Sequence, residues 1–162
     1  RGRRVLACAP SNVAVDNIAE RLAAAKVRIV RLGHPARLLD SVVDFSLDVQ
    51  VTRSDSKELA NDARQDINAV LKRLGGRVDK SQKFQLRAEL TALRKEVRQR
   101  EARAVEQVMQ RAQVVLATNT GAADRFLQGA GAFDVVVIDE AAQALEASCW
   151  IPILRGKKLV LA

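Results

Sequence analysis

Short apolar runs alternate with segments of helical spacing in the first and last parts of the chain. The runs are RRVLACAP, KVRIVRLG, AQVVLATNT, FDVVVIDE and KKLVLA, each short enough to be a buried strand. Between the first two runs, the apolar residues of VAVDNIAERLAAA recur at helical spacing, and Ser11 or Asn12 stands where a helix cap is expected. GAADRFLQGAG and the alanine-rich stretch after Glu140 are further helix candidates. Strands that alternate with helices predict an α/β domain with a parallel sheet.

The middle of the chain has a different pattern. Residues 54–74 and 80–111 repeat apolar residues every three or four positions, and LGGRVD between them predicts a turn. The repeating positions are Leu59, Ala63, Ile67, Val70 and Leu74, then Leu86, Leu90, Leu93, Val97, Ala104 and Val108 after the turn, with an interruption at Arg100. We expect an antiparallel helical hairpin with one apolar seam, inserted into the sheet domain. The domain boundaries predicted from this pattern are 1–52 and 112–162 for the sheet domain and 53–111 for the hairpin.

Composition narrows the classes of protein. With 162 residues, 48% of them apolar, the chain can bury one core. Its two cysteines and single histidine supply neither a zinc framework nor a disulfide scaffold, and we expect Cys8 and Cys149 to pack as small apolar residues. No apolar run reaches membrane-spanning length and no signal-peptide pattern is present, so we expect a soluble, intracellular protein without a membrane partner.

Positive charge is concentrated in the first three quarters of the chain. Lys and Arg outnumber Asp and Glu by 8 to 3 over residues 1–40 and by 15 to 9 over residues 53–111, whereas residues 112–162 have 4 against 5. This distribution favours a polyanionic partner such as nucleic acid, although an ordinary solvated surface gives the same counts. With four Phe, no Tyr and Trp150 placed among apolar neighbours where core packing is expected, a base-stacking platform is not predicted.

Two consecutive carboxylates follow the buried-strand run FDVVVIDE. Ligands of open parallel sheets bind beyond the carboxyl ends of the strands, so Asp139 and Glu140 are delivered to that edge. In nucleotide-hydrolysing folds an aspartate in this position holds Mg²⁺ against the terminal phosphates, and a neighbouring glutamate can deprotonate the attacking water. The pair is therefore a Walker B candidate. An acidic helix cap at the end of a strand is the alternative explanation for the same two residues.

Polar residues also follow two other strand runs. Pro10, Ser11 and Asn12 come after the first run, next to a helix N-terminus whose free amides suit a phosphate. Thr118, Asn119 and Thr120 follow AQVVLA and offer hydroxyls and an amide. Together these groups predict contacts to a sugar-phosphate backbone without sequence preference, although capping and turn formation also account for them.

Four strings occur in an order that is typical of one family. ACAPSNVAVDNIAERL, RLGHPARLL, VVLATNTGA and FDVVVIDEAAQALEASCWIPIL together resemble the superfamily 1 helicases of the up-frameshift type, over nearly the whole chain. APSN resembles helicase motif Ia, ATNTGA motif Ic and DEAAQA motif II. The resemblance implies a RecA-like sheet of the P-loop NTPase type and a motor that moves 5′-to-3′ along single-stranded DNA or RNA with ATP and Mg²⁺.

Individual roles follow from the same resemblance. It implies Asp139 as the Mg²⁺ ligand, Glu140 as the general base and Gln143 as a further residue of the nucleotide site, where an exposed helical glutamine is the alternative. It also implies a monomeric motor, a cytoplasmic and nuclear location, and a ribosome or another ribonucleoprotein as a partner.

Part of the expected ATP site is not in the sequence. No GxxxxGKS or GxxxxGKT occurs, so the phosphate-binding Walker A loop is missing and the fold is expected to be incomplete. We therefore interpret the chain as a slice of the first motor domain that is inactive alone. Two other interpretations stay open: a non-catalytic nucleic-acid-binding module, and a protein-interaction module built on the basic hairpin.

Overall fold

A computed structural model describes residues 2–76 and 78–162, without the side chains of residues 55–61. The chain divides into two compact units, one formed by Arg1–Gln50 with Gln107–Ala162 and the other by Val51–Glu106. The first unit contains the sheet and the second contains most of the hairpin, so the two are described separately. In the described part of the chain, no helix is both long and apolar enough to cross a bilayer.

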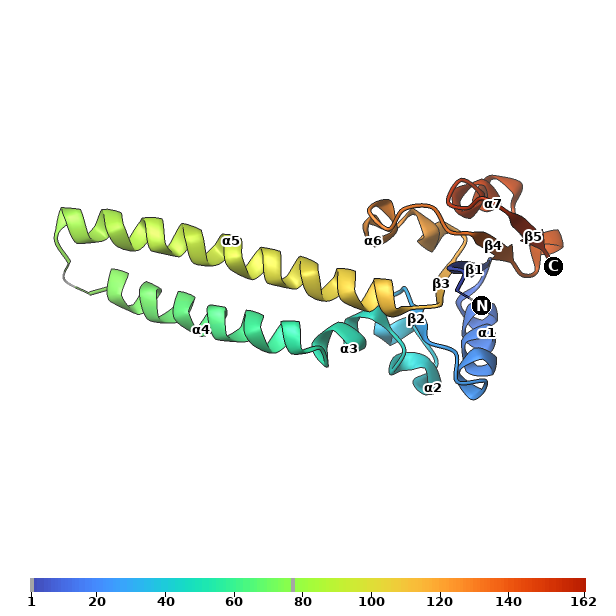
Figure 1. The fold of residues 1–162 in the computed structure, drawn as a ribbon, viewed down its shortest axis with the longest axis horizontal. Coiled ribbons are helices and arrows are strands. Elements are labelled where there is room, and N and C mark those ends of the chain that lie inside the picture. Colours follow the sequence, from blue (N-terminus) through green and yellow to red (C-terminus); the bar gives the residue numbers. More distant parts are fainter. Residues whose placement is uncertain (1, 77) are drawn as a thin grey trace. The chain divides into compact units, whose positions relative to one another are not determined.

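The sheet unit is built on five parallel strands in the order β2-β3-β1-β4-β5 (Figure 1). The strands are β1 (Val5–Ala9), β2 (Ile29–Arg31), β3 (Val114–Thr118), β4 (Val135–Ile138) and β5 (Leu159–Leu161). Each lies within one of the five apolar runs. The prediction of an α/β fold with a RecA-like parallel sheet is therefore confirmed.

β1 is the middle strand, and its apolar residues alternate between two covered faces. Ala7 and Ala9 pack against α1 (Asn12–Ala24) in a cluster that also contains Val15 and Leu116. Figure 1 shows α1 and α7 (Glu146–Ile153) on opposite sides of the sheet. Cys8 lies within β1, and its burial raises the pKa of the thiol to about 12, so the thiol is neutral at physiological pH. Both cysteines are buried as expected.

Shorter helices connect the strands. Before the hairpin these are a 3₁₀ turn at Pro35–Arg37, α2 (Asp40–Val43) and α3 (Leu47–Thr52), none of which the apolar spacing predicts. The helix candidate GAADRFLQGAG is instead a 3₁₀ turn at Thr120–Ala123 followed by the single-turn helix α6 (Arg125–Gln128). Asp124 separates the two because its Oδ1 accepts a hydrogen bond from the Phe126 amide, 2.9 Å away, and so starts a new helix.

The second unit contains α4 (Asp55–Leu74) and most of α5 (Lys80–Arg111), which lie side by side and antiparallel (Figure 1). Ion pairs join Arg64 to Glu101 and Arg73 to Glu89, so the start of α4 faces the later part of α5. The predicted hairpin is confirmed. Of the predicted seam, the side chain of Leu59 is not described, and Arg77 of the predicted turn lies outside the described residues.

The seam near the turn is formed by Val70, Leu86 and Leu90, with Ile67 and Leu93 partly buried beside them. The interruption of the apolar pattern at Arg100 does not break the helix. Arg100 instead pairs with Glu96 one turn earlier, at 2.6 Å.

We predict that Leu86→Ala destabilises the hairpin by about 2–5 kcal/mol, because it leaves a cavity in a narrow seam. Hydrogen exchange of the α4 and α5 amides would measure this destabilisation directly. Phe84→Ala is the control, since Phe84 is 76% exposed two residues away and its removal should change stability by less than about 0.5 kcal/mol. Equal effects of the two substitutions would contradict the assigned seam.

Candidate functional site

Three polar segments leave the sheet at the same edge, because they follow the carboxyl ends of neighbouring parallel strands. In the register of the sheet, Ala9 lies opposite Thr118, and Cys8 lies opposite Ile138. The backbone amide of Asn119 donates to the Ala9 carbonyl at 2.9 Å, and the backbone amide of Asp139 donates to the Cys8 carbonyl at 2.8 Å. Residues 10–12 therefore emerge between the loop after β3 and the acidic loop after β4.

The acidic loop has a tight backbone conformation. Asp139 is half-buried and its Oδ1 accepts a hydrogen bond from the Glu140 amide at 3.0 Å. Glu140 is exposed and left-handed, with φ 55° and ψ 33°, a conformation that non-glycine residues seldom adopt. The next amide, of Ala141, donates to the carbonyl of Ala162 at 2.9 Å, so the loop is also tied to the end of β5.

The expected helix does not follow these acids directly. Glu140 is followed by one 3₁₀ turn, Ala141–Gln143, and α7 begins only at Glu146, because Ala144 and Leu145 have extended backbone conformations between the two. Gln143 lies at the end of this turn with its side chain exposed, and its backbone amide donates to the Glu140 carbonyl at 3.0 Å. Gln143 is therefore near Glu140 through the backbone.

The acidic pair fits a magnesium ion that arrives with a nucleotide. Mg²⁺ is commonly held by one or two carboxylates together with phosphate oxygens and water. Asp139 has one oxygen fixed by the Glu140 amide, which leaves its second oxygen for a metal. Among the described residues there is no group of three or more His, Cys, Asp or Glu that could bind a metal without such a ligand.

The segment after β1 forms the N-terminus of α1. Ser11 is the N-cap, and its Oγ accepts from the Ala14 amide at 3.1 Å, which confirms the predicted cap. Pro10 and Ser11 are exposed, and Asn12 is half-buried. The amides of Asn12 and Val13 have no hydrogen-bond acceptor in the described part of the chain, as is usual for the first turn of a helix.

The segment after β3 presents its three predicted residues differently. The Thr118 Oγ1 accepts from the Gly121 amide at 3.0 Å, and Thr120 is exposed. A side chain at Gly121 would come within 2.8 Å of that hydroxyl, so the turn requires glycine. Asn119 is only 1% exposed, and its Nδ2 lies 3.5 Å from Ser148 Oγ and 3.8 Å from Cys149 Sγ. The Asn119 side chain thus points toward α7, whereas the two threonines lie nearer the surface.

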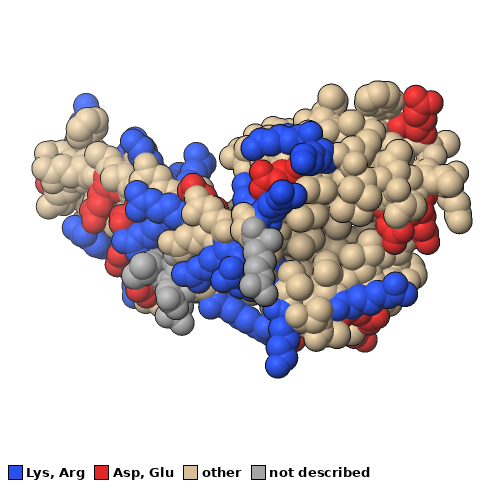
Figure 2. Space-filling view, turned by 45° about the vertical axis from the view of Figure 1, so that its right-hand side comes forward, with Lys and Arg blue, Asp and Glu red and all other residues tan. Residues whose placement is uncertain are grey.

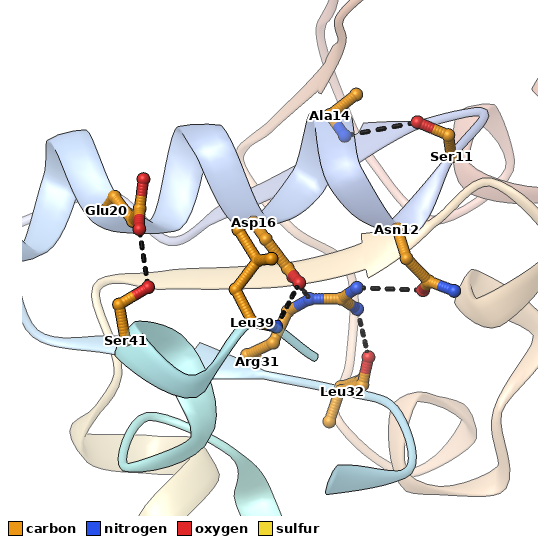
Figure 3. A network of polar contacts seen from close by, with 9 residues as sticks. All are labelled: Ser11, Asn12, Ala14, Asp16, Glu20, Arg31, Leu32, Leu39 and Ser41. Carbon is orange, nitrogen blue, oxygen red and sulfur yellow. Dashed lines mark hydrogen bonds and ion pairs between the residues drawn. The ribbon is translucent and has the colours of Figure 1, made fainter. Parts of the chain in front are cut away.

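Asn12 is hydrogen-bonded to a buried ion pair that no sequence motif indicates. Arg31 of β2 and Asp16 of α1 are fully buried and joined at 2.8 Å between Nε and Oδ1 (Figure 3). Arg31 Nη2 also donates to Asn12 Oδ1 at 3.0 Å, while Asp16 Oδ2 accepts from the Leu39 amide at 3.0 Å. In the sequence, Arg31 and Asp16 are each one of three charged residues in KVRIVRLG and VAVDNIAERL, so nothing there singles them out.

The expectation that Trp150 lies in the core is wrong. Trp150 is 52% exposed, and its indole Nε1 donates to Glu146 Oε1 at 3.3 Å. Cys149 and Pro152 form the buried side of α7, so Trp150 and Leu154, four residues apart, share the opposite face. An aromatic ring is therefore available at this surface, which removes one argument against base stacking.

Comparison with known proteins identifies the family of this chain. A family model described as an AAA domain matches residues 1–162. The DNA-binding protein SMUBP-2 of Mus musculus is 53% identical over the whole chain, and the DNA polymerase alpha-associated DNA helicase A of Schizosaccharomyces pombe is 41% identical over the whole chain. The ATP-dependent helicase NAM7 of Saccharomyces cerevisiae is 36% identical over 98% of the chain.

The chain spans only part of these relatives, covering 17% of the mouse protein, 24% of the fission yeast protein and 14% of NAM7. The shared segment nevertheless includes the three polar loops, the sheet and the helical hairpin. The predicted resemblance to the superfamily 1 helicases of the up-frameshift type is confirmed by the helicases among these relatives. Because a family model matches every residue, the chain belongs to the AAA domain family.

Proposed function

We propose that this chain is the part of an ATP-dependent 5′-to-3′ DNA or RNA helicase that combines the Walker B carboxylates with a binding surface for a single strand. The observation that supports it most strongly is the shared edge of the sheet. The acidic loop after β4 and the polar loop after β3 are hydrogen-bonded to consecutive carbonyls of β1. Nucleotide and nucleic acid would therefore be bound by neighbouring strands of one rigid sheet.

At the nucleotide site, Asp139 would hold Mg²⁺ and Glu140 would act on the attacking water. When bound, the Mg²⁺ ion would neutralise part of the negative charge on the terminal phosphates of ATP. Asp139 is suited to its role because the Glu140 amide fixes one of its oxygens at 3.0 Å. Glu140 is exposed, so its carboxylate is free to orient a water and accept its proton. Gln143, in the following turn, would help to couple the nucleotide site to neighbouring parts of the protein.

The chain alone should not hydrolyse ATP. Its sequence contains no Walker A loop, so Glu140 has no anchored γ-phosphate to act upon. Catalysis would require a phosphate-binding loop supplied by another part of the protein.

At the nucleic-acid site, residues 10–12 and the threonines at 118 and 120 would contact the sugar-phosphate backbone. Small hydroxyls, an amide side chain and free helix amides bind phosphate and sugar oxygens but do not distinguish one base from another. Since the Asn119 side chain is buried, its role would be to shape this loop from inside. Binding is therefore expected to be insensitive to base sequence.

The hairpin would add an electrostatic contribution. Residues 53–111 contain fifteen Lys and Arg against nine Asp and Glu. Figure 2 shows basic side chains interspersed with acidic ones along the hairpin, so part of the charge is compensated locally and the excess stays positive. A protein-binding role of the hairpin is the alternative that salt-dependent titrations separate from this one.

The first prediction from this proposed function concerns the carboxylates in the full-length protein. Glu140→Gln should abolish most ATP turnover while nucleotide affinity is retained, because the amide has the same shape but cannot accept a proton. Asp139→Ala should instead weaken Mg²⁺-dependent nucleotide binding itself. Steady-state turnover and nucleotide titrations with and without Mg²⁺ would be measured side by side. Wild-type turnover in the Glu140→Gln protein would exclude the Walker B assignment and favour a non-catalytic binding module.

The second prediction separates the loops from the hairpin. Reversal of charge at Lys80, Lys83 and Arg87, all exposed, should flatten the dependence of log affinity on log salt by roughly 0.7 for each phosphate of a single strand that the hairpin no longer neutralises. Thr120→Ala should lower the affinity for every sequence by a similar factor and leave that slope nearly unchanged.

Titrations of homopolymeric and random single strands at several salt concentrations would measure both effects. Gln82→Ala with Gln85→Ala is the matched control, because these exposed residues occupy the same turns of α5 without charge. Unchanged affinity and slope after the three reversals would exclude an electrostatic arm, and the hairpin would then be tested for protein partners.

A further inference from the structure

Arg31 occupies an unusual position for an arginine, at the middle of three polar contacts and with no exposed surface. Its Nε donates to Asp16 Oδ1 at 2.8 Å, its Nη1 to the Leu32 carbonyl, and its Nη2 to Asn12 Oδ1 at 3.0 Å (Figure 3). The guanidinium is planar and rigid, so the directions of these three bonds are fixed relative to one another. Asn12, at the start of α1, is thereby held in a defined orientation relative to β2.

The contact determines which end of the Asn12 amide faces outward. A guanidinium has only donors, so the atom of Asn12 that faces Arg31 must be the oxygen. The nitrogen then points away from Arg31, as Figure 3 shows, with two N–H groups available. No hydrogen bond from Asn12 Nδ2 is found in the described part of the chain. Asn12 is half-buried, so this nitrogen can reach a ligand outside the fold.

The network behind Asn12 is balanced in charge and in hydrogen bonds. Asp16 neutralises Arg31, and its second oxygen accepts from the Leu39 amide at 3.0 Å. A buried ion pair of this kind contributes little net stability compared with apolar residues of the same size, but it defines geometry. Among the described residues, the bond to Asn12 is the one contact that this buried pair makes with the loop that is proposed to bind nucleic acid.

We propose that Arg31 is a positioning residue of the nucleic-acid site: it fixes the Asn12 side chain so that the amide nitrogen is presented as a donor to a phosphate or sugar oxygen of the bound strand. The proposal rests on the function proposed above for residues 10–12. It deepens that function by stating which atom makes the contact and which buried group orients it.

A double-mutant experiment on the full-length protein tests this. Arg31→Lys keeps the positive charge next to Asp16 but cannot reproduce the planar fork that also reaches Asn12. Asn12→Ala removes the presented donor. The affinity for a single-stranded homopolymer would be measured for wild type, each single variant and the double variant, together with the temperature of thermal unfolding. Ser41→Ala is the control, because it removes another polar contact to α1, with Glu20, away from Asn12.

We expect Asn12→Ala to weaken binding roughly ten- to hundredfold, the range of one hydrogen bond to a charged group. Arg31→Lys should weaken binding by a similar or smaller factor in the wild type and by none in the Asn12→Ala background. Weakening by Arg31→Lys that is the same in both backgrounds, or none in the wild type, would overturn the positioning role. Unchanged binding by Asn12→Ala would instead remove Asn12 from the proposed nucleic-acid site.

A second variant keeps the test decisive if Arg31→Lys fails to fold. Asn12→Asp retains an oxygen for Arg31 and adds an opposite charge to it, so the unfolding temperature should be kept or raised. The outward nitrogen, however, becomes a carboxylate oxygen that repels phosphate, so binding should fall further than in Asn12→Ala. Binding of wild-type strength by a stable Asn12→Asp protein would show that the outward atom is not a donor to nucleic acid.

Discussion

The carboxyl end of β1 is hydrogen-bonded on both sides, and the arrangement of the candidate sites depends on this. Its last two carbonyls accept from the amides of Asp139 and Asn119, at 2.8 and 2.9 Å. Adjacent strands lie about 4.8 Å apart, so each loop is held one strand spacing from residues 10–12. A slip of one residue in either pairing would also turn the apolar side chains of the strand to the opposite face, which the covered core opposes. The apolar sequence of the strands therefore fixes where the polar loops emerge.

Polar groups inside this unit are placed where a rigid contact is needed. Arg31 and Asp16 are each about 1% exposed, and an unpaired charge at either position would be strongly destabilising. Both are bonded to main-chain groups as well as to each other, which joins α1, β2 and the segment around Leu39. Asn119 gives a second example, because its buried side chain lies against α7 while its backbone amide donates to the Ala9 carbonyl at the end of β1. Both the ion pair and Asn119 stand directly beside or within the proposed nucleic-acid loops.

Local sequence patterns predicted the strands and the long helices, because apolar periodicity and capping act within a few residues. The sheet, α1 with Ser11 as its cap, and the hairpin could all be predicted in this way. The left-handed Glu140 and the exposed Trp150 could not, since each depends on what the rest of the fold places beside it. Arg31 is fifteen positions from Asp16 and nineteen from Asn12, so no local spacing identifies these two contacts. The roles assigned to the individual site residues stay predictions.

The two proposed sites are connected through the sheet unit itself, so communication between them does not require the hairpin. The loop after β3 contacts α7 through the buried side chain of Asn119, and α7 follows the acidic loop by only a few residues. The same two loops share β1 through main-chain hydrogen bonds. A close-packed interior cannot absorb a shift gradually. In the proposed function, a displacement of the acidic loop that moved α7 would therefore also change its contact with Asn119 and, with it, the loop that carries Thr118 and Thr120.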